Sequence, residues 1–514
     1  MRLTRPALIG AATVALLGLA TPARSTPDPL RTYAADTWRS MAAMTDAGTG
    51  LPADKITGDL RTPAKVTSPT DIGAYLWSTI SARDLGLISG REARGRVART
   101  LASIGRLERH SPDGQFYNWY DPKTLRLVTT WPEDGSKVLP FLSSVDNGWL
   151  ATALMMVRTA VPQERATASR LLSGMNFRSY YDPAVAANGT GLLRGGFWPE
   201  DPAPTCSIKA DYLGTGTPVY ETCHTYGSPG ETRIASYVGI ALGQLPPQHY
   251  FGLLRTLGDT GCDFGWQEQK PQGTTRTYLG VPTYEGTYGY RGMRFVPIWG
   301  GSMFEELMPD LFAPERKWAP KSWGANHPIF VAAQIQHGLD EAKYGYWGFS
   351  PSSDPYGGYK AYGIDAIGMQ SDGYASDEEN TLVDYGYEGC RPAQPPPSSY
   401  GDGIVTPHAS FLALPYAPRA ALANLAKLKR NFDAYGRGGF YDAIAVRSGK
   451  VAKTYLSLDQ GMIMAALGNE LGHGDMHRYF AAGEAERRLA PVLRLERWDL
   501  VPPSARVRAS LGIE

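Results

Sequence analysis

The chain alternates between helical segments and long connections rich in glycine, proline, tyrosine and tryptophan. Apolar residues recur in the helical segments at three- and four-residue spacing, the pattern of helices that bury one face. Long connections count against a compact domain unless they serve a function. Because they recur between successive helix pairs, the pattern predicts a mainly α fold, a toroid of helical hairpins whose long loops gather at one end. The helical segments are 30–44, 70–85, 91–107, 146–160, 231–243, 304–312, 328–344, 409–414, 419–432 and 457–471, and the connections are 113–140, 180–229, 261–301, 346–402 and 435–455.

Residues 1–25 have the composition of a secretory signal peptide. A basic start, Met-Arg-Leu-Thr-Arg, precedes an apolar run over residues 7–20, and small residues follow at Ala23 and Ser25. The run is too short to span a bilayer comfortably, and no later segment is long and apolar enough to do so. We therefore expect a cleaved signal peptide and a secreted protein without a membrane anchor. Residues 26–514 are expected to form one catalytic domain that acts as a monomer.

The four cysteines are an even number in a chain expected to reach an oxidising compartment. We expect one disulfide across a local loop and one over a long loop, although three connectivities are possible and the sequence does not choose among them. Metal binding is the alternative, but no C-x-x-C or paired-histidine spacing supports it, and no organic cofactor is implied either. The expected pairs are Cys206–Cys223 and Cys262–Cys390.

Charge and aromatic content narrow the class of ligand. Lysine and arginine total 51 and aspartate and glutamate total 50, so no charge excess argues for a nucleic-acid partner. The 29 tyrosines and 12 tryptophans cluster in the glycine- and proline-rich stretches rather than along the helical patterns. An aromatic side chain in a loop offers an apolar face and, in tyrosine, a polar tip, which suits wet, amphipathic ligands.

The chain lacks the usual motifs of nucleophilic hydrolases, zinc proteases and phosphate-binding loops. Its distinctive acids instead share one setting, beside glycine and aromatic residues, mostly where a loop meets a helix. Helix capping is the commoner role of any one such acid. Several of them at the same end of a toroid favour glycosidic cleavage, which needs one acid to protonate the leaving oxygen and a second carboxylate across the cleft. These acids are Asp146, Glu231, Glu285, Asp402 and Asp459.

The stretch Pro297-Ile-Trp-Gly-Gly-Ser-Met-Phe-Glu-Glu-Leu-Met-Pro309 adds two adjacent carboxylates behind a Trp-Gly-Gly turn. The glycine pair permits a tight bend, and Trp299 is a flat face on which a sugar ring can stack. On a helix, Glu305 and Glu306 point about 100° apart. One can therefore serve a site while the other stays solvated or caps the helix. The alternative is an ordinary helix N-terminus enriched in acids.

A set of short motifs runs in order along the chain: Thr67-Ser-Pro-Thr-Asp-Ile-Gly73, Ala82-Arg-Asp-Leu-Gly-Leu-Ile88, Phe116-Tyr-Asn-Trp-Tyr-Asp121, Ser144-Val-Asp146, Gly301-Ser-Met-Phe-Glu-Glu-Leu-Met-Pro309, Tyr362-Gly-Ile-Asp365, Asp402-Gly-Ile-Val-Thr-Pro407, Gly438-Gly-Phe-Tyr441 and Leu458-Asp-Gln-Gly461. These motifs resemble the glycoamylase-like domain of endo-β-1,2-glucanases of glycoside hydrolase family 144. The same domain forms the transglycosylating part of cyclic β-1,2-glucan synthases. The resemblance extends from about Thr37 to Trp498.

This resemblance implies an (α/α)6 barrel with its cleft at one end, in agreement with the loop pattern. In the family, the aspartate of the Ser-x-Val/Ile-Asp motif and a glutamate that opens a mid-chain helix lie in the substrate cleft. They match Asp146 and Glu231, and the glutamate of the Met-Phe-Glu motif of the synthase branch matches Glu305. One motif departs: Gly348-Phe-Ser-Pro-Ser352 lacks the glutamate of Gly-Ile-Ser-Glu-Ser in the synthase branch, which argues against the transglycosylase mechanism.

The motifs and the resemblance together predict a secreted glycoside hydrolase that cleaves an extracellular polysaccharide or oligosaccharide, with a β-glucan such as β-1,2-glucan as the expected substrate. We expect catalysis by Glu305 and Glu231, one of them as proton donor, with Asp146 as base or as ligand of a sugar hydroxyl. The alternatives are a lyase or hydrolase for another cell-wall glycan, and a non-catalytic glycan-binding protein. The residues expected to bind substrate are Trp119, Trp149, Trp299, Tyr346, Trp347, Glu285, Asp402 and Asp459.

Overall fold

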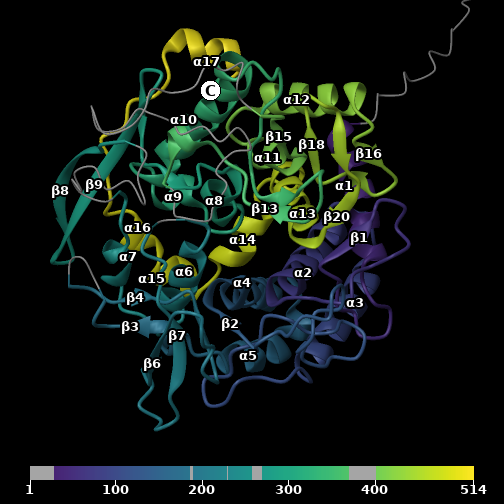
Figure 1. Ribbon diagram of the computed structural model, residues 1–514, viewed down its shortest axis with the longest axis vertical. Helices are drawn as coiled ribbons and strands as arrows, with labels where there is room; N and C mark the ends of the chain where they lie inside the picture. The colour runs from purple at the N-terminus through teal and green to yellow at the C-terminus, as the bar shows by residue number, and fades with distance from the viewer. Residues whose placement is uncertain (1–27, 186–188, 229, 257–268, 370–400, 514) are drawn as a thin grey trace, which may run out of the picture.

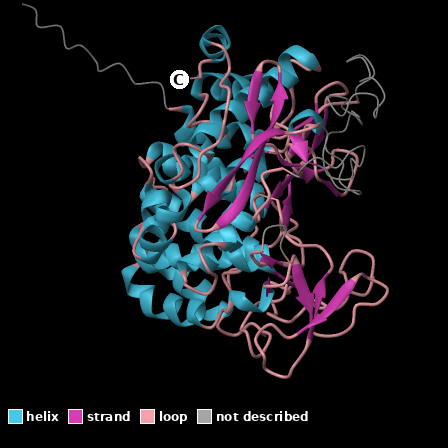
Figure 2. Cartoon of the chain, turned by 90° about the vertical axis from the view of Figure 1, so that its left-hand side faces the viewer, coloured by secondary structure: helices cyan, strands magenta, loops and turns pink. Residues whose placement is uncertain are grey.

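The structure is a computed structural model that describes residues 28–185, 189–228, 230–256, 269–369 and 401–513. The fold is mainly helical, and Figure 2 shows the helices gathered on one side of the molecule with the short sheets and loops along the other. None of the helices in the described ranges has both the length and the apolar character that crossing a membrane requires. The expected signal peptide, Cys262 and Cys390 lie outside the described residues.

Each of the ten expected helical segments contains a helix in the structure, but the ends differ. Pro309 shortens the helix expected over 304–312, and the helix expected over 328–344 begins at Trp323, contains Pro328 and ends at Gln336. The α-helices are α1 Pro29–Ala43, α2 Pro69–Asp84, α3 Gly90–Ile104, α4 Ser144–Ala160, α5 Arg165–Ser173, α6 Arg233–Ala241, α7 His249–Gly252, α8 Met303–Leu307, α9 Glu315–Trp318, α10 Trp323–Gln336, α11 Pro407–Leu412, α12 Pro418–Asn431, α13 Ser457–Leu471, α14 Asp475–Ala481, α15 Glu484–Arg488, α16 Ala490–Leu493 and α17 Ala505–Leu511. Of these, α5, α7, α9 and α14 to α17 were not expected.

The central helices are buried on nearly every side, as their composition requires. Helices α2, α4 and α13 are apolar or small all round, whereas α3 and α12 bury a single face and expose charged residues on the other. In Figure 1, α13 packs against α2, α2 against α4 and α4 against α6, while α8 contacts α11 and α11 contacts α13. One apolar core runs through these helices from Leu30 to Ile513.

Most of the strands are short, and most of them lie in the long connections. Among the described residues, the largest sheet has the strand order β2-β5-β7-β6. The two longest strands, β8 and β9, belong to a second sheet with the order β10-β9-β8. The strands are β1 Lys55–Thr57, β2 Leu142–Ser143, β3 Tyr181–Asp182, β4 Leu192–Leu193, β5 Gly196–Trp198, β6 Ser207–Ala210, β7 Val219–Thr222, β8 Gln272–Tyr278, β9 Val281–Tyr290, β10 Met293–Phe295, β11 Ile298–Trp299, β12 Ser352–Ser353, β13 Tyr359–Lys360, β14 Gly368–Met369, β15 Ile404–Val405, β16 Tyr435–Gly436, β17 Gly439–Phe440, β18 Ala443–Ala445, β19 Lys450–Ala452 and β20 Thr454–Leu456.

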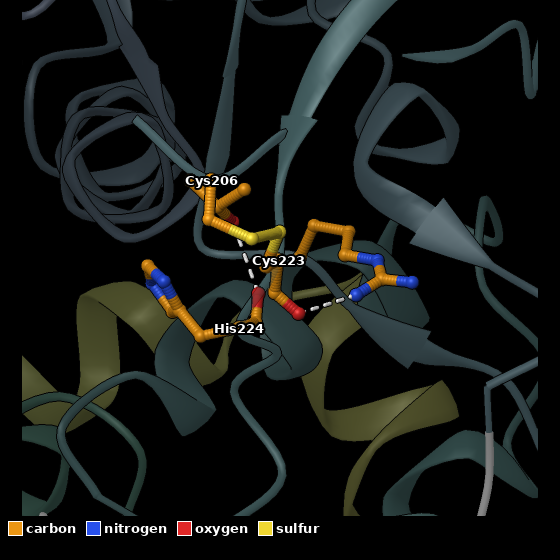
Figure 3. The surroundings of a disulfide bond; sticks show 5 residues. Cys206, Cys223 and His224 are labelled. Carbon is orange, nitrogen blue, oxygen red and sulfur yellow. Dashed lines mark hydrogen bonds between the residues drawn. A yellow bond between two sulfur atoms is a disulfide. The ribbon is translucent and has the colours of Figure 1, made fainter. Parts of the chain in front are cut away.

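A disulfide closes the open end of the β6–β7 hairpin. Cys206 directly precedes β6 and Cys223 directly follows β7, and their sulfur atoms are bonded as expected from the sequence (Figure 3). The carbonyl oxygen of Cys223 accepts a hydrogen bond of 2.8 Å from Nη1 of Arg194. Through β7 and β5 the hairpin pairs with β2, whose last residue, Ser143, caps α4. The β6–β7 hairpin is therefore linked through β5 and β2 to the start of a central helix.

The close contact between α13 and α2 requires a glycine at position 461, and a substitution can test this requirement. A Cβ atom there would lie 2.7 Å from Cβ of Ala74, although alanine is the better helix former. Because both groups belong to packed helices, the overlap outweighs the gain in helix propensity of about 1 kcal/mol. We expect Gly461→Ala to reduce the free energy of unfolding by about 1–3 kcal/mol, measured by urea denaturation.

Gly95→Ala is the matched control. Gly95 lies on the exposed face of α3, and a Cβ atom there would meet no heavy atom within 4 Å. This variant should gain about 1 kcal/mol from helix propensity alone. Equal effects of the two substitutions would contradict the close contact between α13 and α2.

Candidate active site

The N-terminal ends of the central helices face one cavity of about 460 Å³. Asp71 lies in the first turn of α2 and Asp146 in the first turn of α4. Glu305 lies in α8, and Glu231 lies two residues before α6. The N-terminus of a helix carries a positive partial charge and unpaired N–H groups, so it favours carboxylates. The fold thus collects acids from segments far apart in the sequence.

Glu231 and Glu305 are in direct contact. The backbone N–H of Glu231 donates to Oε2 of Glu305 at 2.7 Å, and Nε1 of Trp149 donates to Oε2 of Glu231 at 2.6 Å. The hydroxyl of Thr70 donates to Oδ1 of Asp146 at 2.5 Å. Both glutamates are almost fully withdrawn from solvent, with exposed fractions of 8% for Glu231 and 5% for Glu305.

Burial changes the protonation of this pair. It raises the pKa of Glu305 to about 7, against the lowering effects of the Glu231 N–H and of Arg233. Burial, and next the charge of Glu305, raise the pKa of Glu231 well above its usual value, while the hydrogen bond from Trp149 opposes the shift. Burial and the repulsion between the two charges therefore oppose the ionisation of both groups at once.

Further carboxyl groups line the same cavity. Burial raises the pKa of Asp146, against hydrogen bonds from Ser143 and Thr70, and raises that of Asp54 to about 6. Sequence reasoning missed Asp54 and Asp71 as cavity residues. The signal for Asp71 was present, because it belongs to a Ser-x-x-Asp capping box within the first motif that resembles the family. Asp54 lies next to β1 and carries no such pattern.

Aromatic side chains form part of the cavity wall. The rings of Trp119 and Trp131 meet edge to face with centroids 5.2 Å apart, and both side chains are half-buried. Tyr359, at the start of β13, lines the cavity with 53% of its surface exposed. Trp131 and Tyr359 were not singled out from the sequence, since neither belongs to a motif of the family.

Of the predicted site residues, the structure brings Asp146, Glu231, Glu305, Trp119 and Trp149 to this cavity. The remaining candidates are not among the residues that line it. Asp402 accepts hydrogen bonds from Ser448, and Asp459 is buried in α13 with Oδ2 3.0 Å from Nδ1 of His408. The others lie in β9 beside Arg276 and Tyr278 (Glu285), in β11 (Trp299), and beside α12 (Tyr346 and Trp347).

Glu306 is neither solvated nor a helix cap, so that expectation is corrected. Its side chain is 0% exposed, and Oε1 accepts hydrogen bonds from Nδ1 of His327 at 2.7 Å and from Nδ2 of Asn326 at 3.0 Å. Nε2 of His327 lies 3.0 Å from Oε2 of Glu315. The turn of about 100° between neighbouring helical side chains sends Glu305 to the cavity and Glu306 into the core.

Only one group of acids and histidines in the described ranges has the spacing of a metal site. Ligand atoms of Asp310, Glu315 and His327 lie within 4.8 Å of one another. The Glu315 oxygens already accept from Arg233 and Tyr237, and His327 is held between Glu306 and Glu315. A cation there would have to displace Arg233 and deprotonate His327, so these donors do not fit a metal.

Comparisons with known proteins agree with the resemblance read from the motifs. Residues 278–480 match the model of a family described as “Putative glucoamylase”, and residues 32–183 match a family of unknown function, DUF3131. The cyclic β-(1,2)-glucan synthase NdvB of Rhizobium meliloti is 24% identical over 88% of this chain. The chain spans only 18% of the length of that relative.

Solved structures share the fold. An endo-β-1,2-glucanase from Chitinophaga pinensis, in complex with sophorotriose and glucose, has a TM-score of 0.60 at 16% identity, over 90% of this chain and 97% of the other. A β-1,2-glucanase from Parabacteroides distasonis has a TM-score of 0.61 at 14% identity, over 91% of this chain and 60% of the other. The mainly helical fold of this chain is therefore similar to that of endo-β-1,2-glucanases.

The buried histidine predicts a pH dependence of stability. Burial alone would lower the pKa of His327, but Glu306 and Glu315 raise it from 6.5 to about 10. The folded pKa is above the unfolded one, so this stabilisation is complete below pH 6.5 and is lost as the pH rises through 10. The shift corresponds to roughly 5 kcal/mol. We expect His327→Gln to unfold more easily at pH 7 and to flatten the decline in stability between pH 7 and 10, measured by urea denaturation.

His249→Gln serves as the matched control. His249 is equally buried, but burial lowers its pKa to about 4, so it is neutral throughout this range. This variant should keep the wild-type slope of unfolding free energy against pH. If His327→Gln also keeps that slope, the charged state assigned to His327 is wrong.

Proposed function

We propose that this chain is a secreted glycoside hydrolase that cleaves a β-glucan, with β-1,2-glucan as its substrate. The observation that carries the proposal is the contact between Glu231 and Glu305 in one cavity, with Asp146 and three tryptophans in its wall. Glycosidic cleavage needs a protonated acid at the leaving oxygen and a second carboxylate that acts on water or on the anomeric carbon. Export by residues 1–25 would bring the enzyme to an extracellular glycan.

The protonation states assign the two roles. Burial and the charge of Glu305 favour the protonated form of Glu231, and its Oε2 accepts from Trp149, so we assign to Oε1 the proton that is donated to the glycosidic oxygen. Glu305 ionises near neutral pH and is the carboxylate that acts on water or on the sugar. Asp146, held by Thr70, is placed to accept from a sugar hydroxyl. The aromatic rings supply apolar faces for the sugar rings.

The helices support an (α/α)6 arrangement for this enzyme. Contacts run from α13 to α2, α4 and α6, and from α8 to α11 and back to α13. Arg233 of α6 bonds to backbone carbonyls of α8, and this link supports a ring of six inner helices. The long loops at their N-terminal ends then form the rim of the cleft. In such a barrel the inner helices aim their first turns at the substrate.

The proposed β-1,2 linkage rests on the similar proteins, and the proposed reaction type rests on one residue. The similar proteins are named as acting on or making β-1,2-glucan. Pro351 lines the cavity within the motif where the synthase branch has a glutamate. Without that carboxylate, we expect hydrolysis rather than transfer of the glycosyl group to another sugar.

Product analysis tests this function directly. The purified protein should release short sophoro-oligosaccharides from β-1,2-glucan and leave other glucans, arabinans and mannans intact. Glu305→Gln should lose at least a thousandfold in kcat because an amide cannot ionise, an effect within the usual range for carboxylate catalysis. Glu486→Gln, at an exposed position of α15, is the control and should retain wild-type turnover.

The possible products separate the competing functions. Unsaturated products would identify a lyase, and products from another polymer would reject the β-1,2 linkage but keep the glycosidase. Binding of glucan without any product would identify a glycan-binding protein. Full activity of Glu305→Gln would exclude Glu305 as the catalytic carboxylate.

The aromatic wall predicts an effect on substrate binding. Removing one stacking ring should weaken binding by about 1.4 kcal/mol, within the range of aromatic contacts, which is tenfold. We therefore expect Trp119→Ala to raise KM about tenfold with little change in kcat. Trp198→Ala is the control. Trp198 lies in β5 and is also half-buried, but its ring packs on that of Phe141 and does not line the cavity. Equal KM values for both variants would contradict stacking at Trp119.

A further inference from the structure

The guanidinium of Arg233 uses all of its hydrogen-bonding capacity in the core below the cavity. An arginine has five N–H donors. Nε and Nη2 donate to the two carboxylate oxygens of Glu315 at 2.8 and 2.9 Å. The other donors reach backbone carbonyls: Nη1 bonds to Gly230 at 2.9 Å and to Glu305 at 3.0 Å, and Nη2 bonds to Glu306 at 2.6 Å. The side chain is 1% exposed.

The three carbonyls belong to the two segments that carry the acid pair. Gly230 directly precedes Glu231, and the other two carbonyls are those of Glu305 and its neighbour. The segments are separated by more than 70 residues and meet where the N–H of Glu231 donates to Glu305. A Cβ atom at Gly230 would lie 2.3 Å from Oε2 of Glu305, so the carboxyl group of Glu305 packs directly against the backbone of Gly230.

A ring of buried charges keeps the guanidinium in place. Glu315 also accepts from the hydroxyl of Tyr237 at 2.6 Å and contacts His327, and His327 contacts Glu306. The ring closes on Arg233 through the backbone carbonyl of Glu306. The guanidinium carbon lies 4.0 Å from the ring centroid of Trp323. Every neighbour of Arg233 therefore restricts its position.

Stability alone is a weak reason for such a network. Buried ion pairs contribute little to stability relative to apolar residues of similar volume, because desolvation offsets the attraction between the charges. Here three of the guanidinium hydrogen bonds go to the backbone of the segments that carry Glu231 and Glu305. The guanidinium charge also lowers the pKa of both Glu231 and Glu305, against the larger effect of burial.

We propose that Arg233 is the positioning residue of the active site, a buried fork that joins the segments of Glu231 and Glu305 and is itself held by Glu315, His327 and Glu306. It touches no substrate, since it lies behind the acids. Its role in turnover rests on the glucan hydrolysis proposed above, whereas its role in placing the two acids rests on the contacts alone.

Two substitutions separate the effect of the guanidinium hydrogen bonds from the effect of the positive charge. Arg233→Lys keeps the charge but cannot make the five bonds, so kcat should fall about 100-fold, the effect of a displacement near 1 Å. Arg233→Met removes the charge as well. The groups that face the acid pair are then Asp146 and the two glutamates themselves. Both limbs of the kcat/KM profile on β-1,2-glucan should move to higher pH by about one unit.

Arg255→Lys is the matched control. Arg255 is equally buried, pairs with Glu496 and lies over the ring of Tyr250, but does not line the cavity. It should lose comparable thermal stability while keeping the wild-type kcat and pH profile. A wild-type kcat in Arg233→Lys, or a wild-type pH profile in folded Arg233→Met, would overturn the proposal.

A crystal structure of Arg233→Lys provides a measurement that does not depend on turnover. We expect the 2.7 Å contact between the Glu231 N–H and Oε2 of Glu305 to be lost. If the contact is intact, the positioning role is wrong even if the protein hydrolyses glucan. If the wild type hydrolyses no glucan but the contact is lost in the variant, the proposed function fails and the positioning role stands.

Discussion

Buried carboxyl groups at one end of the central helices are the constraint on which the rest of the structure depends. Withdrawing a carboxylate from water is costly unless hydrogen-bond donors replace its hydration. The donors here are a backbone N–H for Glu305, an indole N–H for Glu231 and a hydroxyl for Asp146. They come from the segment before α6, from α4 and from α2, so these helices have to begin at a common level. The packing of the helices and the hydrogen bonding of the cavity carboxyl groups therefore depend on each other.

The adjacent residues Glu305 and Glu306 show how one short helix serves two environments. Glu305 faces a cavity in which burial raises its pKa to about 7. Glu306 faces the core, where His327 and Asn326 satisfy one of its oxygens. The turn before them is possible because Gly301 adopts a φ of 65° and lies so close to Ile364 that a Cβ atom would meet its carbonyl oxygen at 2.0 Å. Backbone geometry thus directs one of the two adjacent acids to the cavity and the other to the core.

The β structure extends the site beyond the helices. The sheet β2-β5-β7-β6 ends in Ser143, whose side chain caps α4 and accepts from the N–H of Asp146. The disulfide closes the far hairpin of that sheet. Trp119 and Trp131, from the connection between α3 and β2, meet edge to face at the cavity. The long connections therefore build the wall and the support of a site whose acids come from the helices.

The periodic apolar pattern and the order of the short motifs determined the mainly helical class, the similarity to glucan-active proteins and the candidates Asp146, Glu231 and Glu305, because helix faces and motif spacing are local properties of the chain. The sequence could not identify Asp54 or Trp131, which reach the cavity through loops. It could not show that Glu285 forms an ion pair with Arg276 of the neighbouring strand and does not line the cavity. It gave no sign that Arg233 and His327 form one charge network. Only the tertiary structure decided these points, because burial, pKa and hydrogen-bond partners depend on segments that are distant in sequence and adjacent in space.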